Sequence, residues 1–178
     1  MAETALRALG LDQVWLLVSP GNPLKGARDM APLAARLASA RRVADGRHVL
    51  ATDIERRLGT RYTVDTLHAL RRRFPRAHFV WLMGADNLAQ LPRWRRWREI
   101  VRCMPFAVLP RPSYNKAALG GRAAGCLRAA RWPAARARNL ALATPPAWVF
   151  LPAAQHPASA TALRAQRVAT RPMTGEVP

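Results

Sequence analysis

The chain has 178 residues, half of them hydrophobic, which is enough for one domain with a buried core. No window approaches 18 uninterrupted apolar residues, and the start lacks the order of a secretory signal, so we expect neither a membrane span nor export. Cys103 and Cys126 stand far apart without a C-x-x-C or histidine partner. This spacing excludes a disulfide framework or zinc site and predicts a cytoplasmic protein.

Arginine dominates the charge of the chain. Its 29 basic residues against 10 acidic ones give a net charge of +19, and only Lys25 and Lys116 are lysines. Such a positive field concentrates phosphate-bearing partners, which include both nucleic acids and nucleotides. The charge alone does not choose between them.

The first half of the chain alternates helical and apolar segments. We expect a helix over residues 2–9, closed by Gly10, and a strand buried on both faces at 14–18. Thr63 is the predicted N-cap of a helix that stops at Pro75. Between them we expect a loop at 19–23, a helix over 30–44 and a weaker strand at 48–52.

The second half continues the alternation. A buried strand is expected at 78–83, broken by Gly84 and followed by a helical stretch to about residue 104. The remaining expected elements are a strand at 106–109, a helix over 115–131, a loop over 132–146, a strand at 148–151 and a helix from Ser159 through Arg167. Strands that alternate with helices predict an α/β fold with a parallel sheet flanked by helices.

Polar segments follow the predicted strands at the edge where ligands bind in open parallel sheets. They are Ser19 to Lys25, Gly84 to Asn87, Pro110 to Pro112, and His156 to Arg164. One lysine, two arginines, two hydroxyls and several helix N-termini would form a rim suited to phosphate groups.

Five segments of the chain also occur, in the same order, in a known family. They are SPGNPLK, YTVDTL, WLMGADNL followed by LPRWRRW, LPRPSYN, and SATALR. Over residues 2 to about 167 the chain resembles bacterial nicotinate-nucleotide adenylyltransferases. The resemblance implies a Rossmann-like nucleotidyltransferase fold over 1–167, followed by a disordered tail over 168–178. It also implies transfer of AMP from ATP to nicotinate mononucleotide, which yields deamido-NAD and pyrophosphate in NAD biosynthesis.

The resemblance assigns six residues to ATP. Ser159, Thr161 and Arg164, in an S-x-T-x-x-R pattern, would grip its phosphates. Gly84 and Asp86 would lie on the adenosine side, with Arg111 near the same substrate. The structural alternatives are that Ser159 and Asp86 only cap helices and that the two arginines are only solvated.

Other residues are assigned to nicotinate mononucleotide. Thr63 and Thr66 would lie near its carboxylate, at a helix start that favours an anion. Trp94 would stack on the pyridine ring, whereas Trp97 is expected to pack. Lys25 would face the reacting phosphates and is the candidate catalytic residue. No protein metal site is expected, and Mg²⁺ would accompany ATP. The four histidines follow no ligand or catalytic spacing and are read as structural.

One family motif is absent from these 178 residues. The family's G-G-[ST]-F-[DN]-P-x-H-x-G-H loop carries two histidines that contact the ATP phosphates, and the sequence contains no H-x-G-H. We therefore expect the first strand of the sheet to be missing, and an upstream reading frame to encode that strand and loop. We also expect the 178-residue form to be poorly soluble or nearly inactive.

Two other functions stay open. No acidic residue lies between Glu99 and Glu176, as in a basic nucleic-acid-binding module. A catalytically dead remnant that binds nucleotide is the other alternative. The motif order favours the enzyme, with ATP and nicotinate mononucleotide as partners, no membrane and no specific nucleic acid. The sequence leaves a homo-oligomer open.

Overall fold

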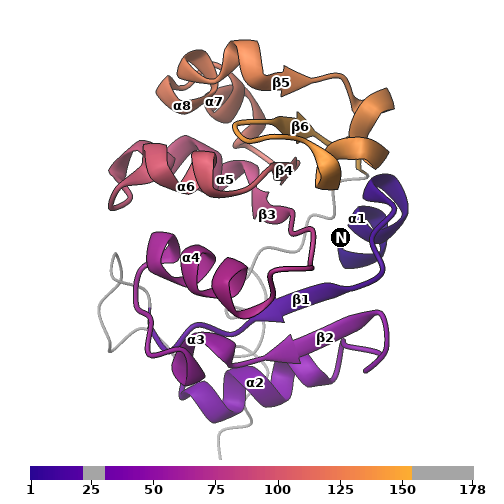
Figure 1. The fold of residues 1–178 in the computed structure, drawn as a ribbon, viewed down its shortest axis with the longest axis vertical. Helices are drawn as coiled ribbons and strands as arrows, with labels where there is room; N and C mark the ends of the chain where they lie inside the picture. Colours follow the sequence, from indigo (N-terminus) through magenta and orange to yellow (C-terminus); the bar gives the residue numbers. More distant parts are fainter. Residues whose placement is uncertain (22–30, 154–178) are drawn as a thin grey trace, which may run out of the picture.

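The computed structural model describes residues 1–21 and 31–153, and within them the strands form two parallel sheets (Figure 1). One sheet has the order β1-β2 and the other β3-β4-β6-β5. The strands are β1 (Val14–Leu17), β2 (Val49–Thr52), β3 (Trp81–Gly84), β4 (Phe106–Leu109), β5 (Arg131–Trp132) and β6 (Trp148–Phe150). The predicted α/β class with parallel strands is confirmed.

Short helices connect these strands and cover the sheets. The α-helices are α1 (Ala2–Leu9), α2 (Leu33–Arg41), α3 (Ile54–Arg57), α4 (Thr63–Arg73), α5 (Ala85–Gln90), α6 (Trp97–Cys103), α7 (Asn115–Leu119) and α8 (Arg122–Cys126). The 3₁₀ segments in the described part of the chain are η2 (Leu91–Arg93), η3 (Arg128–Ala130) and η4 (Ala134–Leu142). As predicted, α1 is closed by Gly10, which adopts the left-handed conformation that suits glycine.

The core of the larger sheet is centred on β4, whose four residues are all buried. Phe106 of β4 stacks on Trp148 of β6 with ring centroids 5.6 Å apart. The indole N–H of Trp148 donates to the carbonyl of Leu127 at 2.8 Å, so its burial leaves no orphaned donor. This packing gives the loops after β3 and β4 a rigid base.

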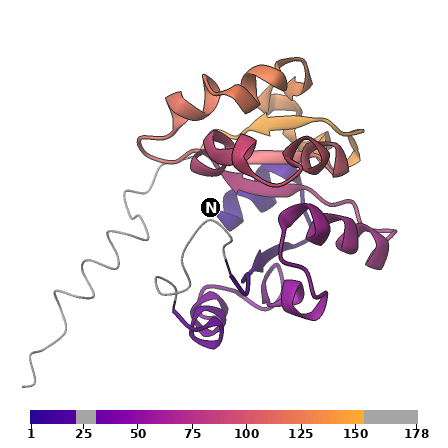
Figure 2. The same cartoon turned by 90° about the vertical axis from the view of Figure 1, so that its left-hand side faces the viewer.

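The strands β1 and β3 belong to different sheets but contribute to one apolar cluster. In the described part of the chain each of these strands has a single strand neighbour, β2 and β4 respectively. Val14 and Leu16 nevertheless share an apolar cluster with Val80 and Leu82. Seen from the side, the second half of the chain forms the upper part of the molecule, and β1, β2 and α2 form the lower part (Figure 2). The prediction that residues 14–18 are buried on both faces is wrong, since Leu17 is 39% exposed.

The helical stretch expected after Gly84 is divided in the structure. It forms α5, η2 and α6, with a break at Trp94–Arg96 where Arg96 takes a left-handed φ of 53°. Thr63 is the first residue of α4 and not its N-cap, a position that Tyr62 occupies without a side-chain cap. The strand β3 begins at Trp81, three residues later than expected.

The segment after β4 also differs from the expectation. The helix expected over 115–131 is divided into α7, α8 and η3, and residues 131–132 form β5. The first break requires glycine at position 121, because a Cβ there would lie 2.7 Å from the carbonyl oxygen of Ala117. The expected loop over 132–146 contains η4.

Candidate functional site

Three predicted residues meet at the carboxyl ends of β3 and β4. Gly84 ends β3, Asp86 lies in the first turn of α5, and Arg111 follows β4. The Nε atom of Arg111 lies 3.6 Å from Oδ1 of Asp86. A Cβ on Gly84 would clash with that Oδ1 and would lie 3.1 Å from the Nε. Glycine therefore allows the acid and the base to approach each other over the strand end.

The facing atoms of this pair lack hydrogen-bond partners. Asp86 Oδ1 and Arg111 Nε are both buried and make no hydrogen bond within the described residues. The side chains as a whole are 31% exposed for Asp86 and 41% exposed for Arg111. Their separation of 3.6 Å is too long for a hydrogen bond. Buried polar atoms are normally satisfied, which makes this pair a candidate ligand contact at the strand ends.

The loop that carries Arg111 is held in place by Asn115. The backbone N–H of Arg111 donates to Asn115 Oδ1 at 2.8 Å, and its carbonyl accepts from the N–H of Tyr114 at 3.2 Å. Sequence reasoning did not single out Asn115, although it ends the quoted segment LPRPSYN. Its role depends on loop geometry that spacing alone does not reveal.

Trp94 lies outside every helix, at the end of η2. Its indole is half-buried, its Nε1 has no partner among the described residues, and its ring lies 5.8 Å from that of Trp81. Tyr62, which precedes α4, packs against the same apolar cluster. The structure therefore brings Trp94 near the start of α4. Trp97 is 8% exposed and packs in the core, as predicted.

The two threonines of α4 differ in environment. Thr63, the first residue of the helix, is half-buried, whereas Thr66 is 1% exposed. The Thr66 hydroxyl donates to Glu55 Oε1 at 3.2 Å and lies 2.9 Å from the Thr60 hydroxyl. Thr66 thus joins α4 to α3. Glu55, whose Oε2 is buried without a partner in the described region, was not identified from the sequence, since α3 was not anticipated.

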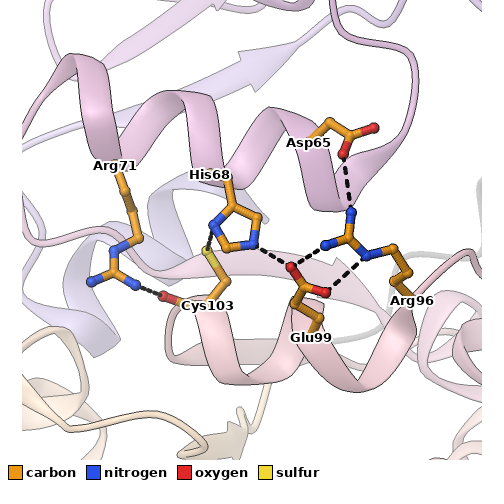
Figure 3. A network of polar contacts seen from close by, with 6 residues as sticks. All are labelled: Asp65, His68, Arg71, Arg96, Glu99 and Cys103. Carbon is orange, nitrogen blue, oxygen red and sulfur yellow. Dashed lines mark hydrogen bonds and ion pairs between the residues drawn. The ribbon is translucent and has the colours of Figure 1, made fainter.

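A charged network fixes α4 against α6 close to Trp94 (Figure 3). Arg96 donates to Glu99 at 2.6 and 2.8 Å and lies 3.7 Å from Asp65 Oδ1. His68 Nε2 contacts Glu99 Oε1 at 2.8 Å. Partial burial raises the pKa of Glu99, but the hydrogen bonds from His68 and Arg96 outweigh it and leave that pKa below its ordinary value. The left-handed Arg96 therefore both breaks the helix and ties the Trp94 segment to α4.

Several predicted features lie outside the described residues. They are Lys25, Ser159, Thr161, Arg164 and the tail over 168–178. Across residues 1–21 and 31–153, no group of three or more His, Cys, Asp or Glu side chains could hold a metal ion. No helix in those ranges has the length and apolar character needed to cross a membrane.

Comparisons with known proteins cover most of the chain. The sequence profile of the cytidylyltransferase-like family matches residues 1–166. A protein of Gluconacetobacter diazotrophicus named as a probable nicotinate-nucleotide adenylyltransferase is 61% identical over 171 residues, which are 96% of this chain and 80% of the relative. Proteins of the same name from Gluconobacter oxydans and Parvibaculum lavamentivorans are 58% and 55% identical, each over 92% of this chain and 84% and 82% of their own lengths.

Proposed function

Because the chain belongs to the cytidylyltransferase-like family, we propose that it transfers the AMP moiety of ATP to nicotinate mononucleotide. The products are deamido-NAD and pyrophosphate. The relatives' names and the order of the five sequence segments support this reaction. The observation that carries it is the Asp86–Arg111 ion pair beside Gly84, whose facing atoms make no hydrogen bond in the described residues and lie at the strand ends where α/β folds bind ligands.

The reaction requires positioning more than covalent chemistry from the protein. A phosphate oxygen of nicotinate mononucleotide attacks the α-phosphorus of ATP, and the bond from that phosphorus to the bridging oxygen of the β-phosphate breaks. Pyrophosphate leaves with the electron pair of that bond. In-line alignment and neutralisation of phosphate charge therefore supply most of the rate. Mg²⁺ would enter as part of the ATP complex, bound to phosphate oxygens.

The ATP end is assigned to the strand-end pair. Asp86 Oδ1 would accept a hydrogen bond from an amino or hydroxyl group of the adenosine, while Arg111 Nε would donate one. Gly84 allows both side chains to lie close to the strand end, because a Cβ at this position would clash with Asp86 Oδ1. Ser159, Thr161 and Arg164 are assigned to the phosphates from their sequence pattern alone.

The nicotinate end is assigned to Trp94 and the start of α4. A half-buried indole offers a flat face to the cationic pyridinium ring. The first N–H groups of α4, beginning at Thr63, are suited to the nicotinate carboxylate. Thr66 acts as a positioning residue, because its hydroxyl is committed to Glu55. Lys25 keeps its assignment to the reacting phosphates.

Calorimetric titration of the 178-residue chain tests the proposal. We expect ATP and nicotinate mononucleotide each to bind at a single site. Arg111→Gln should lower the affinity for ATP by about tenfold or more, because one charge-assisted hydrogen bond is lost. The affinity for nicotinate mononucleotide should not change. Arg128→Gln is the matched control, since Arg128 is exposed on η3. Equal effects of the two variants on ATP would contradict the assignment.

A further inference from the structure

A groove of about 540 Å³ lies at the amino ends of β3, β4 and β6. It is bounded by the last turns of α4 and by the segments 74–79, 103–105 and 141–145, which lead into those three strands. Gly84, Asp86 and Arg111 lie at the carboxyl ends of the same parallel sheet. The groove is therefore at the opposite edge from the candidate site, and the proposed reaction does not use it.

The basic side chains that line the groove come from α4 and from the segment before β3. They are His68, Arg71, Arg72 and His78, and no carboxylate within the described residues lines it. Figure 3 shows His68 and Arg71 projecting from α4 toward α6. Arg71 donates to the carbonyl of Cys103 at 2.8 Å, which fixes its guanidinium and leaves further N–H donors for a ligand. Glu99 of α6 contacts His68 at 2.8 Å, and the same carboxylate is also paired with Arg96 at 2.6 Å.

The remaining walls are mostly apolar. Phe74 and Phe79 lie with ring centroids 6.2 Å apart in an edge-to-face arrangement. Met104 and Pro105 line the groove from the segment before β4. A cavity of a few hundred Å³ with apolar walls and a few convergent polar groups is the usual setting for a small organic ligand.

We propose that this groove binds a small organic anion with an aromatic ring or a comparable apolar body. The anionic group, a carboxylate, sulfonate or phosphate monoester, would pair with Arg71 and Arg72. The ring would lie against Phe74, Phe79 and Met104. The proposal rests on the lining of the groove and not on the adenylyl-transfer reaction.

The test uses two fluorescent probes that share a ring system and differ in charge. The anion 8-anilinonaphthalene-1-sulfonate should bind the full chain at a single site, whereas the neutral N-phenyl-1-naphthylamine should bind about tenfold more weakly or worse, for want of one charge-assisted contact. Inorganic phosphate should compete poorly, because it lacks the ring. Equal affinity for the charged and neutral probes would overturn the proposal. Displacement of the bound sulfonate probe by inorganic phosphate at concentrations similar to that of the probe would also overturn it.

Substitutions of groove residues test whether the probe binds there. Arg71→Gln and Arg72→Gln should each lower the affinity for the sulfonate probe several-fold. Arg42→Gln removes the same charge from the end of α2 and should leave that affinity unchanged. Ala141→Trp, which fills the groove without removing a charge, should also abolish binding. Circular dichroism identifies any variant that fails to fold. Unchanged sulfonate binding in folded Arg72→Gln and Ala141→Trp proteins would overturn the proposal.

Discussion

Arg111 Nε lies 3.6 Å from Asp86 Oδ1, and the Cα of Gly84 lies beneath the point where they approach. The two charged residues are 25 positions apart in the chain and come together because β3 and β4 are parallel neighbours. Neither facing atom has a hydrogen-bond partner in the described structure. Buried polar atoms are normally satisfied, so we expect a ligand or an ordered water to complete their hydrogen bonds.

The glycine at this point gives a first prediction. Gly84→Ala should destabilise the fold by about 1–3 kcal/mol, the usual cost of overpacking, because the new methyl group collides with Asp86. ATP affinity should fall together with stability, since the Asp86–Arg111 geometry changes. Thermal unfolding and ATP titration measure the two effects. Gly125→Ala in α8 is the control, as nothing lies within 4 Å of the added methyl group. Equal tolerance of both substitutions would argue against a tight contact at Gly84.

Trp94 gives a second prediction. Trp94→Ala should lower the affinity for nicotinate mononucleotide several-fold, since stacking of about 0.5–1.5 kcal/mol on the pyridine ring is lost. The affinity for ATP should change little. Separate titrations of the two ligands measure this difference. Trp132→Ala, which removes an aromatic residue from β5, should change neither affinity. If both ligands weaken equally with Trp94→Ala, the indole is a packing residue.

Thr66 gives a third prediction, which separates positioning from ligand contact. Thr66→Val keeps the shape but removes the hydroxyl that donates to Glu55, so we expect a loss of about 1–3 kcal/mol in the free energy of unfolding. Thr66→Ser keeps the hydroxyl and should retain most of that hydrogen-bond stability. Denaturant unfolding measures both variants. A stable Thr66→Val protein that has lost only nicotinate mononucleotide binding would instead make Thr66 a direct ligand contact.

The turn before β2 gives a pH-dependent prediction. The backbone N–H groups of Val49, Arg47 and His48 donate to Asp45 Oδ1 at 2.7–2.8 Å and lower the pKa of Asp45 below its ordinary 3.8. A carboxyl whose pKa is lower in the folded state stabilises the fold above its unfolded pKa, and this stabilisation is lost as the pH falls through the folded value.

Asp45→Asn should therefore lower the Tm at neutral pH and cost progressively less below about pH 4. Thermal unfolding across this range measures the difference between variant and parent. Asp12→Asn removes a carboxylate that makes no side-chain hydrogen bond in the described region and serves as the control. A Tm difference that stays constant from neutral to strongly acidic pH would contradict the assignment.

The sequence was sufficient for the larger features of the fold because these depend on local signals. Gly10 closes α1, Pro75 follows the end of α4, and the apolar run at 106–109 is fully buried in β4. The rim that carries Asp86 and Arg111 follows from the strand order of a parallel sheet. The family resemblance is likewise confirmed by the comparisons.

Features that depend on contacts between distant segments were missed. Trp94 and Trp97 have helical spacing, so the break between them was not expected; it accompanies the left-handed Arg96 and its bonds to Glu99. The burial of Thr66 depends on α3, a four-residue helix too short to be detected by periodicity. The missing hydrogen bond between Asp86 and Arg111 depends on the distance between their side-chain atoms, which the spacing of residues in the sequence does not determine.

Native mass spectrometry of the chain with ATP, Mg²⁺ and nicotinate mononucleotide tests the central claim most directly. We expect a complex that carries both nucleotides on one chain, followed by the appearance of deamido-NAD and pyrophosphate in equal amounts. Arg111→Gln should lower the fraction of this complex that carries ATP, and Trp94→Ala should lower the fraction that carries nicotinate mononucleotide. A chain that never carries the two nucleotides together, yet binds single-stranded RNA in a salt-sensitive manner, would contradict the account and favour a basic nucleic-acid-binding module.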